Sequence, residues 1–425
     1  MANFDSKAIS KKIGPVLNKV QKSKLVNGIT GGMMLAMPVT LLGAFSSLFL
    51  NLPITAWKDF IASSGVVAVL NTSIQFTTNF LAVVFTLSIA GSYAKQYKED
   101  SIIASLLSVV CLFIVTPLSV IKVDNATITS IPMEWLGAKG IFTAILISLI
   151  STRLYIYIKQ KGWTIKMPAN VPPVVSSSFS SLIPGFIVAI LFLIISGVFA
   201  ATDYKTIHAF IYAFIQIPLQ GLGGNIISII ILWTFAQILW FFGIHGTLVI
   251  YSVVLPIFAA MDAAQLAAYS AGEALPNITG RAFVSTYTMS ASAIGFALLM
   301  VFFAKSKQYK TLGKLSAVPS LFGISEPLVF GTPLVFNVRF AVPFIFMNAI
   351  NLIIAYTLTA IGIIPRVAGM TQVSGTPIVL TGLMEGSWKI AALQVVLVIL
   401  EMIVWYPFFR KADKEALETE MKAEA

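Results

Sequence analysis

The sequence predicts an all-α integral membrane protein with about ten transmembrane helices, each needing about 20 apolar residues, re-entrant hairpins in its second half and both termini in the cytoplasm. The composition is the first observation behind this prediction, since the 425 residues are 57% hydrophobic and only 11% charged. Soluble domains carry roughly 25% charged residues. The second observation is that long stretches contain no Asp, Glu, Lys or Arg, and the third is that the basic residues gather between these stretches.

Half of the spanning helices are expected in the first part of the chain. The stretches that predict them are 25–57, 60–94, 101–121, a stretch that starts at 140 and contains Arg153 near its end, and 181–201. The long side chain of Arg153 can extend to the membrane interface from the end of its helix. The short, mixed stretch 204–218 follows, and it is typical of an amphipathic helix that lies along the interface.

The other half follows in the second part of the chain. The longest charge-free run, 209–261, is too long for one helix and is interrupted by the sequence GIHG at 243–246. With this interruption as the turn, the predicted spanning helices cover 225–241, 247–261, 283–304, 340–364 and 389–409, the last of which contains Glu401.

Two further apolar segments, 315–335 and 367–388, are too interrupted by glycine and proline to span a membrane. Irregular backbone at membrane depth is tolerated only where protein or a water-filled cavity covers it. Transporters build substrate sites from such broken segments. These two segments therefore predict re-entrant hairpins, and they predict that the substrate site lies in the second half.

The distribution of basic residues predicts the orientation, because lysine and arginine are enriched on the cytoplasmic side of a membrane. Ten alternating spans place both termini and every basic cluster on that side. The clusters are the N-terminal lysines, Lys95 and Lys98, the group Lys159, Lys161 and Lys166, the group Lys305, Lys307, Lys310 and Lys314, and the C-terminal Arg410, Lys411 and Lys414. We divide the chain into N-terminal helices at 1–201, an amphipathic connector at 202–224, a substrate-binding domain at 225–410 and a charged, solvated cytoplasmic tail at 411–425.

Several functional classes are not expected. The single cysteine, Cys111, and the two histidines, His208 and His245, predict neither a disulfide framework nor a cysteine- or histidine-rich metal site. The net charge of +11 is spread over short clusters rather than one basic face with interleaved aromatic residues, so no nucleic acid is expected as a partner. No Walker A sequence is present, and no cofactor or metal is predicted.

His245 is the first candidate site residue, because it is the only titratable group, tyrosines aside, between His208 and Asp262. It sits between glycines at the predicted helix break. One interpretation is a structural hydrogen bond to a backbone carbonyl that the break leaves free. We favour the other, a ligand or proton partner that faces a cavity, because ionisable groups inside membranes are costly and usually functional.

Glu326 is the second candidate, in the sequence LFGISEPLVFG at 321–331, where Pro327 and the flanking glycines resist a regular helix. A structural carboxylate would cap a helix end or pair with Arg339. We favour a functional one, since a carboxylate at a hairpin tip can accept hydrogen bonds from sugar hydroxyls and can orient or deprotonate one of them.

Amide and aromatic side chains supply weaker candidates. The amides in or beside predicted spans are Asn225, Gln237, Asn337, Asn348 and Asn351, of which Asn225 and Asn337 are the best placed. Amides suit hydroxyls because they offer donors and an acceptor, but they also join helices to each other. Trp240 and Trp388 are candidates for stacking on a sugar ring, with interfacial aromatic belts as the alternative. Glu273 and Glu385 lie at predicted segment ends and are weaker still.

Two sequence motifs, FFGIHG at 241–246 and GISEPLVFGTPLVFN at 323–337, occur in this order and about eighty residues apart. Together with the lysine-rich start and the MPVT sequence at 37–40, they resemble the membrane-spanning IIC component of the bacterial phosphoenolpyruvate-dependent sugar phosphotransferase system, in its lactose, cellobiose and diacetylchitobiose family. The resemblance extends over nearly the whole chain.

This resemblance implies a homodimer whose first five helices form the interface, and a second-half transport domain that moves in an elevator-like manner in the bacterial cytoplasmic membrane. It implies that the bound disaccharide is phosphorylated at its 6-hydroxyl by a separate cytoplasmic IIB protein with a phosphocysteine, so this chain is expected not to be an enzyme. By similarity, His245 and Glu326 would hold the sugar hydroxyls. The substrate-binding set that we predict is His245, Glu326, Asn225, Trp240, Gly243, Gly246, Ser325, Asn337 and Trp388.

In contrast to fused family members, the chain is expected to lack a IIB domain, because it ends about fifteen residues, roughly four helical turns, after its last predicted span. This arrangement is expected for cellobiose and chitobiose systems, so cellobiose or diacetylchitobiose is the predicted substrate. The competing hypothesis is a proton-coupled secondary sugar transporter that uses Glu326 or His245 as the proton carrier.

Overall fold

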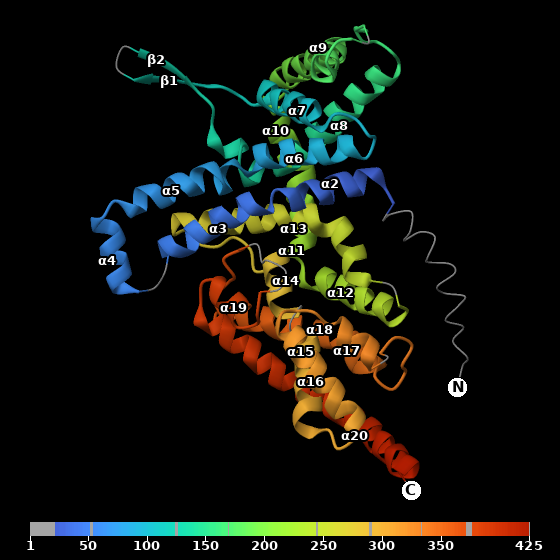
Figure 1. Ribbon diagram of the computed structural model, residues 1–425. Helices are drawn as coiled ribbons and strands as arrows, with labels where there is room; N and C mark the ends of the chain where they lie inside the picture. Colours follow the sequence, from blue (N-terminus) through green and yellow to red (C-terminus); the bar gives the residue numbers. More distant parts are fainter. Residues whose placement is uncertain are drawn as a thin grey trace. The chain divides into compact units, whose positions relative to one another are not determined.

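The computed structural model describes residues 22–424 except 52–53, 124–125, 169, 244, 289–290, 333 and 371–375. It also leaves out the side chains of Lys122, Val123, Ala126, Ser252, 291–293, Glu326, Phe330, Ala423 and Glu424. The chain forms two compact units. We call Lys19–Gly221 with Leu255–Glu273 the N-terminal unit, and Leu222–Val254 with Ala274–Ala425 the C-terminal unit. Figure 1 shows the elements of both.

The N-terminal unit is a set of packed helices around α6. Its helices are α2 (Lys24–Leu35), α3 (Met37–Asn51), α4 (Thr55–Ser63), α5 (Val66–Phe76), α6 (Leu81–Lys95), α7 (Ser101–Val115), α8 (Ile141–Gln160), α9 (Pro173–Ala200) and α10 (Ile207–Ile211). Helix α6 packs against α2, α7 and α8. A Cβ added to Gly32 of α2 would lie 2.4 Å from the Cα of Ile89 on α6, so only glycine allows this close approach.

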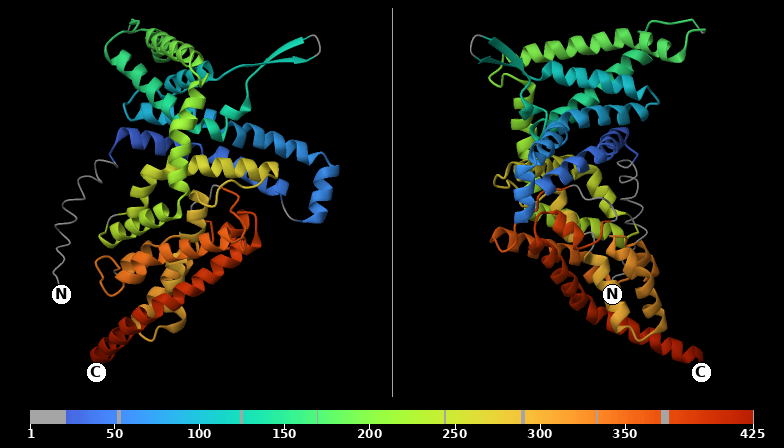
Figure 2. Two further views of the ribbon diagram at one scale, coloured as in Figure 1. Left: turned by 180° about the vertical axis from the view of Figure 1, so that it is seen from behind. Right: turned by 60° about the vertical axis from the view of Figure 1, so that its left-hand side comes forward.

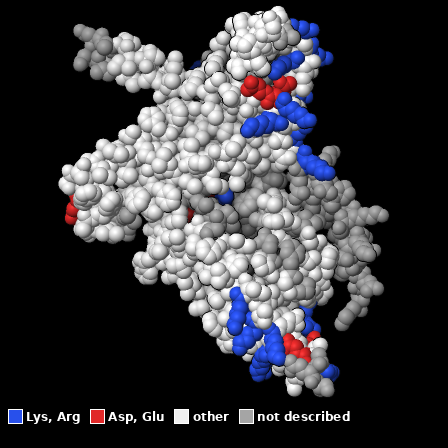
Figure 3. Space-filling model, viewed as in Figure 1, with Lys and Arg blue, Asp and Glu red and all other residues white. Residues whose placement is uncertain are grey.

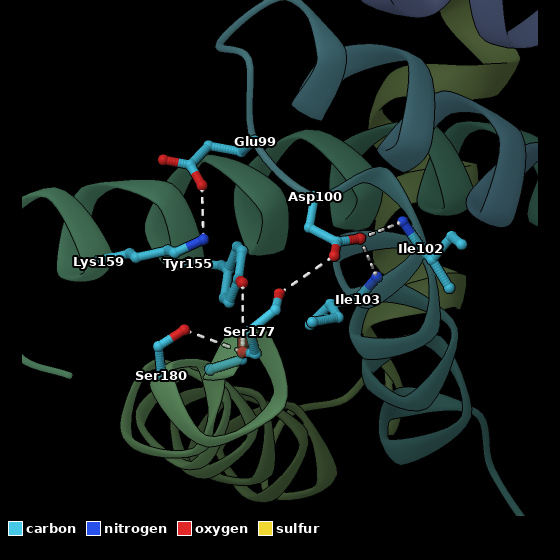
Figure 4. Close-up of polar contacts among 9 residues, drawn as sticks. Glu99, Asp100, Ile102, Ile103, Tyr155, Lys159, Ser177 and Ser180 are labelled. Atoms are coloured by element: carbon cyan, nitrogen blue, oxygen red, sulfur yellow. Dashed lines mark hydrogen bonds and ion pairs between the residues drawn. The ribbon is translucent and has the colours of Figure 1, made fainter. Parts of the chain in front are cut away.

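Polar and charged contacts join one end of α7, α8 and α9 (Figure 4). Asp100 caps α7 by accepting hydrogen bonds from the backbone amides of Ile102 and Ile103, and it also accepts one from the Ser177 hydroxyl of α9 at 3.2 Å. Lys159 of α8 pairs with Glu99 at 2.7 Å. The basic residues predicted to cluster here are therefore partly neutralised by neighbouring carboxylates.

A short β-hairpin differs from the all-α prediction. Strands β1 (Ser119–Val123) and β2 (Ala126–Ser130) pair antiparallel, with Ser119 opposite Ser130. Helix α7 ends at Val115, before the end of the span predicted over 101–121, because Thr116 precedes Pro117 and adopts an extended conformation. The β-branched residues that follow favour strands. Figure 2 shows the hairpin extending away from the neighbouring helices.

The connector and the C-terminal unit follow. A π-helical turn (Tyr212–Gln216) joins α10 to α11 (Ile217–Gly224). The later helices are α12 (Ile226–Phe241), α13 (Gly246–Ala271), α14 (Arg281–Thr288), α15 (Ala291–Phe303), α16 (Lys307–Leu321), α17 (Glu326–Gly331), α18 (Ala341–Ala360), α19 (Leu380–Met384) and α20 (Trp388–Glu424). Helix α13 is divided between the two units, with Leu255 as its first residue in the N-terminal unit. Helix α15 lies against α16 and α20, where Phe296 stacks on Trp405 at 4.1 Å between ring centroids. The predicted break at 243–246 is confirmed.

Among the described residues, six helices are long and apolar enough to cross a membrane, or up to eight if each of two bent helix pairs is one span. The pairs are α2 with α3, bent by 43°, and Ile207–Gly224 with α12, bent by 71°. These helices agree with a membrane protein, and the figure of about ten spans remains a prediction.

The tail at 411–425, which we predicted to be solvated, continues α20 as far as Glu424. Part of it is bonded to the residues at the start of α16. Asp413 accepts hydrogen bonds from the backbone amides of Lys305 and Ser306, at 2.8 and 3.0 Å, and from the Ser306 hydroxyl at 2.7 Å. Glu420 accepts two more from the backbone of Lys307 and Gln308. These carboxylates satisfy amides at the start of α16. Figure 3 shows basic and acidic residues gathered together at this end of α16 and α20.

Candidate functional site

The junction of α12 and α13 requires glycine at two positions. Gly243 has a φ of +77°, a left-handed conformation that other residues rarely adopt. Gly246 is the first residue of α13, and a Cβ added there would lie 1.9 Å from the carbonyl oxygen of Ala236 on α12. The backbones of the two helices therefore approach each other so closely that no other side chain fits at Gly246.

His245 lies between these glycines, and its ring acts as a cap for α13. Its Nδ1 accepts a hydrogen bond from the backbone amide of Leu248 at 3.3 Å, and its ring centroid lies 4.3 Å from that of Trp240. The Trp240 indole donates in turn to the Thr247 hydroxyl at 3.3 Å. A neutral His245 with an accepting Nδ1 carries its proton on Nε2, which makes Nε2 a donor. The hydrogen bond at Nδ1 is thus made with a backbone amide.

The segment that contains Glu326 is a short, broken helix. Helix α16 ends at Leu321, Gly323 adopts a φ of +75°, and Ser325 precedes the six-residue helix α17. Glu326 begins α17 and Pro327 follows it, a position where proline is tolerated because the amide it lacks has no helical partner. The Glu326 side chain is outside the described part of the structure. Arg339, the partner in the structural alternative, bonds to Glu415 at 2.5 Å.

The two motifs come together in the C-terminal unit. The backbone amide of Phe336 donates to the carbonyl oxygen of Phe241 at 2.9 Å, and the Phe336 ring lies 5.8 Å from that of Phe242. Phe336 adopts a φ of +57°, which is uncommon for a residue other than glycine. The first residue of FFGIHG is therefore bonded to the last residue but one of GISEPLVFGTPLVFN. This junction is the candidate site.

Asn337 follows directly and lies in the same region. Its Oδ1 accepts from the backbone amide of Arg339 at 3.2 Å, which orders the turn into α18. An open hollow on the surface is lined by Tyr309 and by the residues from Val335 to Phe340. The structure thus places Trp240, Gly243, His245, Gly246 and Asn337 around one junction.

One predicted site residue, Asn225, is not brought to this junction. Asn225 caps the opposite end of α12 by accepting from the backbone amide of Ile227 at 2.8 Å. A helix of the sixteen residues of α12 is about 24 Å long, so Asn225 is far from His245. Trp388 is the first residue of α20 and is 69% exposed. Glu273, a weaker candidate, is exposed just after α13.

Sequence reasoning missed a buried amide, Gln394, and undervalued Glu385. Gln394 accepts from the backbone amides of Val379 and Gly382 and donates to the Thr286 carbonyl and the Thr381 hydroxyl. It therefore joins α19, α20 and α14. Its signal was visible, since it is an amide within the predicted span 389–409.

Glu385 is buried at the end of α19, and its Oε2 accepts from the backbone amides of Gly369 and Met370 at 3.0 and 3.2 Å. Both bonds hold the loop at Gly369 and Met370 in place. Residues 371–375, which follow it, are outside the described residues. Among the residues that are described, no group of three His, Cys, Asp or Glu side chains could hold a metal ion.

Comparison with known proteins gives consistent matches. A family model described as the phosphotransferase system EIIC matches residues 30–347. The oligo-beta-mannoside-specific EIIC component of Bacillus subtilis (strain 168) is 32% identical, over 97% of this chain and 95% of the relative. The cellobiose-specific EIIC component of Geobacillus stearothermophilus is 30% identical, over 95% and 93% of the two chains.

A solved structure has the same fold. It is the crystal structure of the transporter ChbC, the IIC component from the N,N'-diacetylchitobiose-specific phosphotransferase system. The TM-score is 0.90 at 31% identity, with 98% of this chain and 100% of that chain covered. The chain therefore belongs to the EIIC family of the phosphotransferase system, the membrane-embedded sugar permeases of that system.

Proposed function

We propose that this chain carries a disaccharide, cellobiose or diacetylchitobiose, across the bacterial cytoplasmic membrane and presents its 6-hydroxyl to a separate IIB protein for phosphorylation. The observation that supports this most strongly is the bonded junction between FFGIHG and GISEPLVFGTPLVFN, formed by Phe336 and Phe241. Two of the proteins that the chain resembles are named for cellobiose and diacetylchitobiose.

His245 and Glu326 are the residues we propose to bind the sugar. The Leu248 amide fixes Nδ1 of His245 as an acceptor, so Nε2 would donate to a sugar hydroxyl. The Glu326 carboxylate would accept from a hydroxyl and raise its nucleophilicity when IIB delivers the phosphoryl group. The phosphorus–sulfur bond of the IIB phosphocysteine breaks, a phosphorus–oxygen bond to the sugar forms, and the hydroxyl proton goes to Glu326 or to water.

The other predicted sugar contacts are supported to different degrees, some by contacts in the structure and some by sequence alone. Trp240, beside His245, is suited to stack on the sugar ring, and Asn337 and Ser325 lie in the second motif. Gly243 and Gly246 would shape the backbone rather than contact sugar through a side chain. Asn225 and Trp388 stay in the proposed set on sequence grounds alone.

The proposed architecture follows from the family resemblance. Residues 1–201 would form the interface of a homodimer, 202–224 the connector, and 225–410 the transport domain that moves in an elevator-like manner. Both termini and the basic clusters would face the cytoplasm. The basic residues near the start of α16 and the end of α20 would then attract an acidic, phosphorylated partner such as IIB.

Uptake by membrane vesicles tests this function. With cellobiose or diacetylchitobiose outside, we expect uptake only when phosphoenolpyruvate and the soluble carrier proteins are supplied inside, and we expect sugar phosphate as the product. Accumulation of free sugar driven by a pH gradient alone would establish the proton-coupled alternative instead. Competition among cellobiose, diacetylchitobiose, lactose and gentiobiose for the purified protein identifies the substrate.

A further inference from the structure

Glu401 lies fully buried in the middle of α20, far from the candidate site motifs in sequence. Its Oε2 accepts a hydrogen bond from the backbone amide of Gly295 on α15 at 3.2 Å. A Cβ added to Gly295 would lie 2.5 Å from this oxygen, so the carboxyl group packs directly on the α15 backbone. A polar group in such a position needs a partner for each of its polar atoms.

Polar atoms one helical turn from Glu401 on α20, and on the face of α18 that carries Asn351, are also buried and short of partners. Glu401 interacts with the side chain of Asn351 on α18, although no hydrogen bond of good geometry joins them. The polar atoms without a partner are Oε1 of Glu401, Oδ1 and Nδ2 of Asn351, Oδ1 of Asn348 and Nε1 of Trp405. Asn348 and Asn351 are one helical turn apart, so both face the same side of α18.

No positive charge neutralises Glu401 in the described part of the chain. Helix α15 carries no charged side chain, and α18 carries none either. The charged or titratable groups on the helices packed against α20, and on the described part of α20 itself, are Arg281 and Tyr287 on α14, Lys307, Tyr309, Lys310 and Lys314 on α16, Tyr356 on α18, and Lys389, Tyr406, Arg410, Lys411, Asp413, Lys414, Glu415, Glu418, Glu420 and Lys422 on α20. None of these groups forms an ion pair or a hydrogen bond with Glu401. An ionised carboxylate here would be a buried charge without compensation.

The unpaired atoms of Glu401, Asn348, Asn351 and Trp405 include both donors and acceptors, and this mixture indicates what they can bind. A metal cation needs acceptors only, yet Trp405 Nε1 and Asn351 Nδ2 can only donate. A proton on Oε1 turns one of the unpaired acceptors into a donor, and the acceptor it needs, Asn351 Oδ1, is on the neighbouring side chain.

We propose that Glu401 is a proton-binding site, in which the neutral carboxyl group accepts from the Gly295 amide through Oε2 and donates from Oε1 to the Asn351 amide oxygen. The proton comes from water and no other bond changes. The site joins α15, α18 and α20 within the C-terminal unit. It is separate from the sugar chemistry proposed for Glu326 and His245, so its test does not depend on that function.

Glutamine is the matched replacement, because it has the size of a neutral glutamate and can accept at one terminal atom and donate at the other. Glu401→Gln is therefore expected to fold and to keep sugar binding unchanged. Glu401→Leu removes both bonds and leaves the Gly295 amide and Asn351 unpaired, so it is expected to lower the melting temperature of the purified protein.

Infrared spectroscopy of the full-length protein in lipid at neutral pH tests the proton directly. We expect the wild-type minus Glu401→Gln spectrum to show the carbonyl stretching band of a protonated carboxylic acid. A difference spectrum that shows only carboxylate bands would overturn the proposal. Glutamate labelled with ¹³C at its side-chain carboxyl provides the same measurement on the wild-type protein, so the result does not depend on how the variant folds.

Asn351→Leu tests the proposed partner, with Asn348→Leu as the matched control one turn away. We expect Asn351→Leu to move the acid band to higher frequency because the hydrogen bond is lost, and Asn348→Leu to leave it in place. An unshifted band in Asn351→Leu, or an equal shift in both variants, would contradict the bond to Asn351.

Discussion

Gly246→Ala tests the packing that forms the candidate site. The added Cβ would lie 1.9 Å from the carbonyl oxygen of Ala236, 2.6 Å from its carbonyl carbon and 2.8 Å from its Cα. A carbon and a carbonyl oxygen in contact are ordinarily about 3.3–3.6 Å apart, so α12 and α13 must separate by about 1.5 Å. The clashing atoms belong to backbone, which cannot move aside as a flexible side chain can.

The expected magnitude follows from this geometry. Forcing an extra methyl group into a packed region costs about 1–3 kcal/mol, and a backbone clash belongs at the upper end of that range. The helix shift also moves His245, which precedes Gly246 and bonds to the first turn of α13. We expect sugar affinity to fall at least tenfold, which corresponds to about 1.4 kcal/mol of binding free energy.

Two measurements on purified protein check this prediction: thermal unfolding, and equilibrium binding of cellobiose or diacetylchitobiose. Gly221→Ala in α11 is the control, because no atom lies within 4 Å of its added Cβ and its φ is not in the left-handed region. The control is expected to match or slightly exceed the wild-type stability, by up to about 1 kcal/mol. If Gly246→Ala unfolds and binds sugar as the control does, the close approach of α12 and α13 is wrong.

Three further variants have defined outcomes. Asp413→Ala leaves the backbone amides of Lys305 and Ser306, just before α16, without their acceptor, and it should destabilise the protein by about 1–2 kcal/mol in denaturant unfolding. Glu418→Ala, in an exposed pair with Lys414, should change the unfolding free energy by no more than about 0.5 kcal/mol, and equal effects of the two variants would contradict the role of Asp413. Gln394→Leu leaves two backbone amides and one backbone carbonyl without partners, and each unpaired group costs about 1–3 kcal/mol of folding free energy. The melting temperature of this variant should therefore lie well below that of Gln308→Leu, the control, in which an exposed side chain is changed. Glu326→Gln should retain sugar binding better than phosphorylation by IIB, and an equal loss of both would mean that the carboxylate is a ligand only.

The positions of the helices could be predicted because each leaves a local pattern of apolar residues. The break between α12 and α13 was predicted from GIHG, and it occurs there. The hairpin at 119–130 was missed because Val120 and Ile121 extend the apolar run of α7, and hydropathy alone does not distinguish a strand from the end of a helix.

The candidate site could be predicted only in part. The two motifs identified His245 and Glu326, and the cap formed by His245 is local, since its partner is three residues away. The bond between Phe336 and Phe241 joins residues ninety-five positions apart in the sequence, and no local pattern encodes such a contact. The same reason explains why Gln394 was overlooked, because its partners lie on α14 and in the segment 379–382.

The contacts of α20 suggest how the broken segments of the C-terminal unit are held in place. Asp413 and Glu420 bond to the start of α16, which leads into Glu326, and Glu415 bonds to Arg339, which follows the second motif. Gln394 holds α19 from the same helix. A helix of the 37 residues of α20 is about 56 Å long, so one rigid element fixes segments that have little regular structure of their own. Because Asp413, Glu420 and Gln394 bond to backbone groups, substitution of any one of them should alter sugar affinity through the placement of Glu326, although none of these side chains is proposed to contact the sugar.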